Sequence, residues 1–301
     1  MVEIMHAAKR GEIKGMYIEG ENPEMSDPDL NHAQEALVSL GHLVVLDLFM
    51  TETVFHADIA LPAAALAEKS GSFTNIDRRG QLARPVVPSP GAAKQDWWII
   101  QQLGQPLGPT WNYEGRGEIF AEMAQTMPLL RNITWDRLQR EDAVTYSVDS
   151  ADAHGDGIIF TNQFPTPSGR ARMVPTQVLP PGELPGMDFP MVLSTGSVPE
   201  HWHTGSMTRR AEMLDAIEPE AVALLSPQEL LRRNIAPGGT IRVETRPGVI
   251  EIRARADHDG PANMIFIPFC YAEAAGNPLT NPALDPIGKI PEFKFCGARI
   301  L

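Results

Sequence analysis

Residues 191–210 read MVLSTGSVPEHWHTGSMTRR, and we expect the second half of the chain to be organised around them. Met191-Val192-Leu193 is a short apolar run, which predicts a buried strand. The loop after it offers hydroxyl groups, two imidazoles, an indole and free backbone N–H groups. These groups suit a polar heterocycle that carries phosphates. A solvated loop in which the Trp folds back for cover is the alternative, and composition alone leaves both open.

The composition is that of an ordinary globular protein of about two domains. The chain has 301 residues, 43% of them hydrophobic and 21% charged. Its formal net charge of −13 argues against nucleic acid as a main partner, because that binding requires clustered positive charge. The apolar runs are too short for membrane insertion, and the first residues lack the apolar core of a secretory signal. The two widely separated cysteines, Cys270 and Cys296, fit a cytoplasmic protein.

The first 50 residues predict one βαβ unit. Apolar runs at 15–18 and 42–49 predict strands, and Asp27-Pro28 is a good N-cap and first-turn pair for a helix through Leu40. Such a unit implies a parallel pair of strands, and ligands bind beyond the carboxyl ends of parallel strands. The loops at 20–29 and 51–53 are therefore candidate ligand-binding loops.

Weaker signals follow in the middle of the chain. We expect a third short strand at 56–62, a helix capped by Asp96, and further helices at 118–126 and 135–140. Residues 155–186 are rich in Pro and Gly, so a domain boundary is expected near residue 160.

The last third predicts a small closed barrel. Residues 215–225 suggest helical turns, and Ser226-Pro227 suggests the start of a further helix. Strands are predicted at 240–245 and 249–256, where apolar residues alternate with charged ones, and at 264–269. Several short strands of this kind fit a barrel.

Five ordered blocks of sequence resemble one family. They lie within residues 20–29, 47–62, 68–81, 201–210 and 277–294. Together they resemble the carboxyl-terminal part of the alpha (catalytic) chain of cytoplasmic, NAD-linked, molybdopterin-dependent formate dehydrogenases. A lone Gly-Glu-Asn-Pro motif is unspecific, whereas five blocks in family order over about 270 residues are a specific signal.

The resemblance implies an α/β architecture. Residues 1–105 would be a partial Rossmann-like domain, 106–160 a connecting segment with short helices, and 161–301 a small, double-psi-like β-barrel that binds a molybdopterin dinucleotide. In the intact family enzyme, a bis-molybdopterin guanine dinucleotide with Mo or W oxidises formate to CO2. A 4Fe-4S cluster then passes the electrons toward NAD.

The resemblance also implies which residues contact the cofactor. In the first half these are Gly20, Glu21, Asn22, Asp27, Asp47, Thr51 and Thr53. In the second half they are Ser194, Thr195, Gly196, Ser197, His201, Trp202, Thr204, Asn277, Phe293 and Lys294. The Asp27 carboxylate can accept from a guanine edge or merely cap a helix, and both readings stay open. Ser197 stands where the family usually has Arg, so one phosphate contact is in doubt.

No catalytic residue and no metal ligand is expected in this chain. In the family, the cysteine motifs of the cluster, the metal-ligating Cys or selenocysteine and the substrate arginine all lie upstream. The resemblance therefore implies partners: the upstream part of the alpha chain, NAD- or flavin-carrying and iron–sulfur subunits, and formate. The chain alone is expected to be inactive on formate.

Three alternatives stay open at this point. The same scaffold could run another reaction, as in a nitrate reductase, or be a silent relative in a respiratory complex. It could also belong to a non-catalytic protein that binds or assembles the molybdopterin dinucleotide. A plain nucleotide-binding α/β protein is the third.

Overall fold

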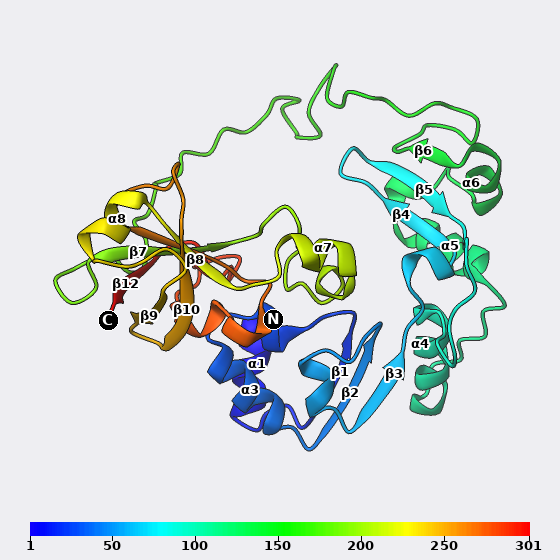
Figure 1. The fold of residues 1–301 in the computed structure, drawn as a ribbon. Coiled ribbons are helices and arrows are strands. Elements are labelled where there is room, and N and C mark those ends of the chain that lie inside the picture. Colours follow the sequence, from blue (N-terminus) through cyan, green and yellow to red (C-terminus); the bar gives the residue numbers. More distant parts are fainter. The chain divides into compact units, whose positions relative to one another are not determined.

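The structure is a computed structural model that describes all 301 residues. Packing divides the chain into two compact units. The first combines Met1–Leu61 with Val178–Leu301, and the second is Pro62–Gln177 (Figure 1). Both predicted domain boundaries, at residues 105 and 160, fall inside the second unit. They remain predictions about domains, because compactness of packing is a different property.

The first unit begins with the predicted βαβ arrangement. Its elements are α1 (Val2–Lys9), β1 (Gly15–Glu19), α2 (Pro23–Ser26), α3 (Leu30–Val38), β2 (His42–Asp47) and β3 (Ile59–Pro62). The sheet has the order β1-β2-β3, and β1 and β2 are parallel, with Gly15 opposite His42. Helices α1 and α3 bury Met5, Ala8 and Leu37 against this sheet. The parallel pair is confirmed, whereas a Rossmann-like domain stays a prediction.

The start of the second helix differs from the prediction. Helix α3 begins at Leu30, and its N-cap is Asp29, whose carboxylate accepts from the His32 N–H at 3.4 Å. Asp27 has extended backbone (φ −77°, ψ 150°) between α2 and α3. Residues Pro23–Ser26 form the short helix α2, so α3 begins later and its N-cap lies two residues after the predicted one. The prediction of Asp27 as the N-cap of this helix is therefore wrong.

The second unit contains a small antiparallel sheet and three helices. They are β4 (Gly71–Thr74), β5 (Arg79–Ala83), β6 (Ala143–Thr145), α4 (Asp96–Gly104), α5 (Arg116–Thr126) and α6 (Trp135–Glu141). The predicted helices are confirmed, with Gln95 rather than Asp96 in the N-cap position of α4. Phe120, Ile133 and Leu138 are buried in the core of this unit. Residues 146–190 hold no helix or strand.

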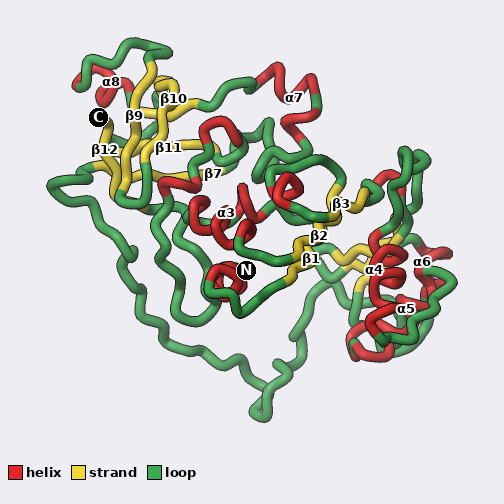
Figure 2. The backbone as a smooth tube through the Cα atoms, turned by 90° about the horizontal axis from the view of Figure 1, so that it is seen from below, coloured by secondary structure: helices red, strands yellow, loops and turns green.

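The rest of the first unit is a closed six-stranded barrel. Its strands are β7 (Met191–Gly196), β8 (Val222–Leu225), β9 (Thr240–Thr245), β10 (Val249–Ala256), β11 (Met264–Pro268) and β12 (Cys296–Ile300), in the order β10-β8-β11-β7-β12-β9 (Figure 2). Helices α7 (Glu212–Ile217) and α8 (Pro227–Arg232) connect them. The predicted barrel is confirmed. Leu193, Val243 and Ile265 are fully buried in its core. The alternation of Val243 with charged neighbours and the apolar runs around Leu193 and Ile265 predict this burial.

Two strands of the barrel escaped sequence reasoning. Residues 222–225 form β8 rather than a helical turn, because they pair with both β10 and β11. Residues 296–300 form β12, which contains Gly297 and Ala298 and therefore gives little β signal. Pairing of β12 with β7 and β9 closes the barrel.

Asn277 joins the barrel to the beginning of the chain. Its Nδ2 donates to the carbonyl oxygens of Met25 at 2.7 Å and of Asp27 at 2.9 Å. The side chain is only 4% exposed. Figure 1 shows the blue first segment beside the orange segment that holds Asn277. The predicted barrel and the predicted βαβ loop therefore meet directly.

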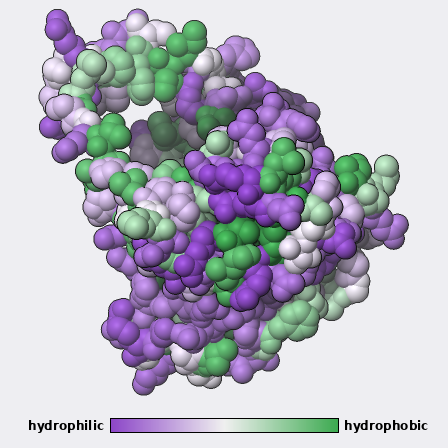
Figure 3. Space-filling view, turned by 60° about the vertical axis from the view of Figure 1, so that its left-hand side comes forward, coloured by the Kyte–Doolittle hydropathy of each residue, from purple (hydrophilic) through white to green (hydrophobic).

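The surface is mixed. Hydrophilic residues dominate the face in Figure 3, and hydrophobic side chains lie there in separate groups. None of the helices combines the length and the apolar character that a membrane crossing requires. Both cysteines are buried as free thiols.

Truncation of Val243 is expected to destabilise the barrel by about 2 kcal/mol, from lost apolar burial and the cavity left behind. The matched control is Val249→Ala on the neighbouring strand, since Val249 is 45% exposed and Val243 is fully buried. Urea denaturation followed by circular dichroism measures both. Equal losses for the two variants would contradict the barrel core.

Replacement of Asn277 by Ala leaves two buried carbonyl groups without a donor. An unpaired buried group costs about 1–3 kcal/mol, so residues 22–29 are expected to exchange their amide hydrogens faster. Hydrogen exchange read by mass spectrometry measures this, and Gln228→Ala at an exposed position of α8 is the control. Unchanged exchange at 22–29 would show that Asn277 does not hold this loop.

Candidate functional site

Asn22 lies at the carboxyl end of β1 and is fully hydrogen-bonded. Its Oδ1 accepts from Thr53 N at 3.2 Å and from Thr53 Oγ1 at 2.7 Å. Its Nδ2 donates to Glu52 Oε2 at 2.8 Å and to Ser206 Oγ at 3.1 Å. An amide has two donors and two acceptor positions, so all are in use. A cofactor contact by this side chain, or by the buried Thr53 hydroxyl, would have to replace one of these bonds.

Asp47 and Thr51 form a second polar pair at the end of β2. Thr51 Oγ1 donates to Asp47 Oδ2 at 3.2 Å, and the Leu48 N–H donates to Asp47 Oδ1 at 2.6 Å. Burial raises the pKa of the Asp47 carboxyl, while these donors and Arg210 oppose the rise. Thr51 is fully buried. The carboxylate of Asp47 is thus the more accessible of the two predicted contacts.

Asp27 is the feature of this region that is least explained by the fold. It is 7% exposed, and its Oδ2 is buried without any hydrogen-bond partner. Burial raises the pKa of its carboxyl to about 6, the amino terminus opposes the rise, and Glu21 adds to it. A buried carboxyl oxygen without a donor is costly. The fold therefore leaves one acceptor oxygen of Asp27 without a protein donor.

The loop before Asp27 has open space around its turn. Gly20 has a left-handed φ of +60°, and a Cβ there would meet no atom within 4 Å. Glu21 is exposed, and its Oε1 accepts from the Asn22 N–H at 3.2 Å and from Ser26 Oγ at 2.6 Å. The exposed glycine backbone can approach a phosphate closely.

The carboxyl end of β7 packs against the last segment of the chain. Thr195 Oγ1 donates to the Phe293 carbonyl at 2.8 Å, and Lys294 Nζ donates to the Thr195 carbonyl at 2.8 Å. The Lys294 ammonium also lies over the Phe269 ring at 5.5 Å. A Cβ on Gly196 would lie 2.5 Å from the Phe266 ring, so this glycine is required for packing. These four predicted contacts, Thr195, Gly196, Phe293 and Lys294, are brought together.

The loop at residues 197–210, called the 197–210 loop below, carries an exposed aromatic group. Trp202 is 71% exposed, and its ring lies 4.4 Å from the His203 ring. The His203 ring lies in turn 6.2 Å from Phe269. Ser197 is exposed and Ser194 is half-buried within β7. The rings offer flat apolar surface next to the end of β7.

His201 serves the fold in this structure. It is 1% exposed, and its Nε2 lies 2.8 Å from the Glu218 carbonyl oxygen, which also accepts from Tyr271 Oη at 2.9 Å. Its ring packs edge-on against Tyr271. Its Nδ1 is buried without a partner. His201 therefore fixes the base of the 197–210 loop and keeps one free ring nitrogen.

Sequence reasoning missed three residues that connect the two halves of the site. The Ser206 hydroxyl accepts from Asn22 and lies 2.9 Å from Thr204 Oγ1, and the Ser206 carbonyl oxygen accepts from Arg210 Nη1. Glu52 accepts from Asn22. Ser206 and Arg210 lie in the block that resembles the family, and Glu52 lies in a loop predicted to bind ligand. Position in those blocks was the available signal.

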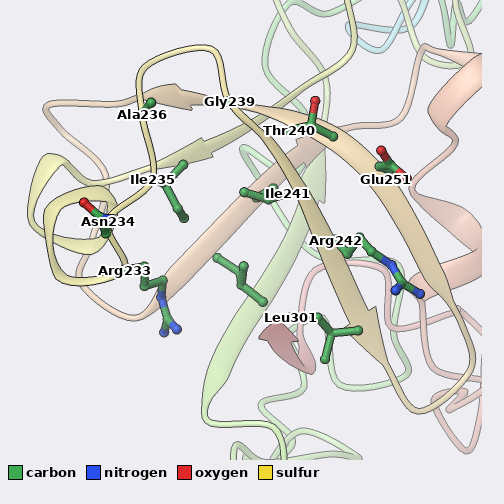
Figure 4. Close-up of a pocket in the computed structure, with 11 residues that line it drawn as sticks. Arg233, Asn234, Ile235, Ala236, Gly239, Thr240, Ile241, Arg242, Glu251 and Leu301 are labelled. Carbon is green, nitrogen blue, oxygen red and sulfur yellow. The ribbon is translucent and has the colours of Figure 1, made fainter.

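One cavity lies elsewhere. It measures about 680 Å³ and is formed by the loop after α8 together with β9, β10 and the chain end. In Figure 4, Ile235 and Ile241 face its centre, while Arg233 and Arg242 extend away from each other. None of the predicted site residues lines it. No group of three or more His, Cys, Asp or Glu side chains is arranged to hold a metal ion.

Two protein-family models match parts of this chain. Residues 1–105 match the family model described as Molybdopterin oxidoreductase, and residues 191–297 match the one described as Molydopterin dinucleotide binding domain. The chain is 41% identical over 290 residues to the F420-dependent formate dehydrogenase subunit alpha of Methanocaldococcus jannaschii. That alignment covers 96% of this chain and 43% of the relative.

Two further known proteins are similar to this chain at lower sequence identity. The assimilatory nitrate reductase catalytic subunit of Bacillus subtilis is 33% identical, over 99% of this chain and 43% of that protein. The acetylene hydratase of Pelobacter acetylenicus has the same fold, with a TM-score of 0.80 and 20% identity over 99% of this chain and 46% of that chain. The chain thus spans less than half the length of these relatives. Its homologues include alpha subunits of formate dehydrogenases, and the chain matches molybdopterin oxidoreductase sequence in residues 1–105 and a molybdopterin dinucleotide-binding domain in residues 191–297.

Proposed function

We propose that this chain forms part of the pocket for a molybdopterin guanine dinucleotide in the alpha subunit of a formate dehydrogenase. The observation that carries the proposal is the Asp27 carboxyl, which is buried with an oxygen that no protein donor reaches. It follows the exposed turn at Gly20, beyond the carboxyl end of β1. A guanine base has adjacent N–H donors, and carboxylates are strong acceptors for them.

The residues at the site fit such a ligand in two groups. Asp27 would accept from the guanine edge, and the backbone of the loop at Gly20 would face a phosphate. Lys294 and the rings of Trp202 and His203 would contact the other end of the dinucleotide, where positive charge and flat surface suit phosphate and pterin. Asn22, Thr51 and Thr53 would act one step removed, because their polar groups are already bonded within the protein.

The bound cofactor would supply the two-electron redox chemistry, through Mo or W held by its dithiolenes. This chain's own residues would bind and orient it and keep water from its guanine end. No residue here is assigned to proton transfer or to metal ligation. A second dinucleotide, a 4Fe-4S cluster and the remaining subunits would belong to the rest of the enzyme. We place the complete enzyme in the cytoplasm.

The electron acceptor of the complete enzyme would be a soluble hydride carrier. The resemblance of the sequence predicts NAD, whereas the relative from M. jannaschii is named as F420-dependent. Both are soluble hydride carriers, and acceptors of this kind are bound by partner subunits. We therefore propose a formate dehydrogenase whose electron acceptor is a soluble hydride carrier. The name of the relative favours F420 as that carrier.

A second candidate function is nitrate reduction on the same scaffold. It is favoured by the similarity to the nitrate reductase catalytic subunit, which covers 99% of this chain. The identity is lower than to the formate dehydrogenase relative, 33% against 41%. Both candidates share the cofactor, so the binding site proposed for Asp27 is common to them.

The experiment that tests the proposal is a cofactor-binding assay. The purified chain is incubated with molybdopterin guanine dinucleotide released from a denatured molybdoenzyme, washed, and hydrolysed. Release of about one GMP per chain is expected, and absence of GMP would refute the proposal. Formate-dependent dye reduction by the loaded 301-residue chain is expected to be absent, and measurable activity would contradict the assignment of catalysis to residues outside it.

Replacement of Asp27 by Asn is expected to weaken GMP binding by about tenfold or more, since the amide offers one acceptor in place of a carboxylate. Isothermal titration calorimetry with GMP measures the loss. Asp58→Asn is the control, because Asp58 is an exposed aspartate of the same unit. Equal GMP affinity for wild type and the Asp27 variant would remove Asp27 from the site.

The same substitution is expected to change how stability depends on pH. The folded pKa of about 6 lies above the usual value of about 4 for Asp, so the stabilising contribution of the protonated carboxyl is present below pH 4 and is lost as pH rises through 6. Between pH 5 and pH 8 the wild type should lose about 1 kcal/mol more than the Asn variant. Urea denaturation at both pH values measures this, and parallel curves would show that Asp27 is not perturbed.

A further inference from the structure

Arg210 connects two loops that lie 160 residues apart in sequence. Its Nη2 donates to the Met50 carbonyl at 3.0 Å, and its Nη1 donates to the Ser206 carbonyl at 2.6 Å. The guanidinium also lies over the Phe49 ring at 5.0 Å. One planar group therefore holds both the end of β2 and the 197–210 loop. A guanidinium suits this task because its donors diverge in a fixed fork while its face stacks on an aromatic ring.

A second bond crosses the same junction. Asn22 Nδ2 donates to Ser206 Oγ, and that amide is held in place by Thr53 and Glu52. Ser206 is therefore held twice, through its hydroxyl and through its carbonyl.

The opposite side of the loop is held by the barrel. Gly205 has a left-handed φ of +73°, and a Cβ there would lie 2.6 Å from the Cys270 carbonyl oxygen. The loop backbone is also bonded internally, from Gly205 N to the Trp202 carbonyl at 2.9 Å. Its barrel side is thus tightly packed, whereas its β2 side depends on Arg210 and Ser206. The two sides can fail separately.

We propose that Arg210 is a positioning residue that latches the 197–210 loop onto the end of β2, so that the cofactor pocket is formed before the cofactor arrives. This inference rests on the proposed function for its ligand but not for its geometry. Arg210 does not touch the residues assigned to the guanine edge. It acts on the loop that carries Trp202, His203 and Thr204, which would contact the far end of the dinucleotide.

The size of the effect follows from the chemistry of the latch. Arg210 is exposed, so its bonds compete with water, and its acceptors are neutral carbonyls. Loss of two such bonds and one stacked ring should shift the open-to-closed ratio of the loop by about tenfold. A ligand that requires the closed loop then binds about tenfold more weakly. A ligand confined to the guanine subsite is unaffected.

The experiment compares Arg210→Met and Arg210→Lys with the wild-type chain. Hydrogen exchange of the backbone amides at 200–206 should be about tenfold faster in Arg210→Met. Arg210→Lys should lie in between, because an ammonium keeps the charge but lacks the stacked fork. The Kd for molybdopterin guanine dinucleotide should rise about tenfold in Arg210→Met, while the Kd for GMP and the urea midpoint stay at the wild-type values.

Arg242→Met is the matched control, since Arg242 is an exposed arginine on β9 beside the separate cavity. It should leave exchange at 200–206 and both affinities unchanged. Wild-type exchange rates at 200–206 in Arg210→Met would overturn the latch. Equal weakening of GMP and dinucleotide would also overturn it, since that pattern is a general loss of structure. If wild type binds neither ligand, the proposed function fails, and the exchange rates still decide the latch.

Discussion

Two buried asparagine side chains bind the first 61 residues to the barrel and its loops, and the candidate site lies where these two parts of the chain meet. Asn277 donates to two carbonyl groups of the loop after β1, and Asn22 donates across to Ser206. Each amide is nearly or fully satisfied, so each bond replaces a contact with water that the buried groups have lost. Sequence separations of 250 and 184 residues are bridged in this way. Apolar packing alone would place these segments together without fixing which loop faces which.

The same region shows a cost that the fold does not offset. Asp27 is buried beside its bonded backbone carbonyl, yet its carboxyl oxygen has no donor and its pKa is raised to about 6. A buried acceptor without a donor is expected where a protein binds a ligand, because the ligand can supply the missing hydrogen bond. By contrast, Asn22, Thr51 and Thr53 are already satisfied within the protein. These side chains therefore support the loops of the site, and the ligand would contact other groups.

Prediction from sequence succeeded where the pattern was local. The alternation in β9 and β10, the apolar runs of β1 and β2, and Ser226 at the start of α8 were all found, since each depends on neighbours in sequence. It failed at β8, at β12 and at the cap of α3. Val222–Leu225 is a strand because two other strands flank it, and Cys296–Ile300 is a strand because it closes the barrel. Propensity carries no information about such partners.

The same distinction between local pattern and contacts in space applies to the candidate site. The sequence by itself determined the barrel, the parallel pair and, through ordered blocks, the kind of cofactor family, and it predicted which loops bind the ligand. Only the tertiary structure decided that Asp27 keeps an unpaired oxygen while Asp29 takes the role of helix cap. It also decided that His201 is bonded to Glu218 and that Arg210 spans two loops. Such roles depend on which donors and acceptors meet in space, and residue type and spacing along the chain do not specify that.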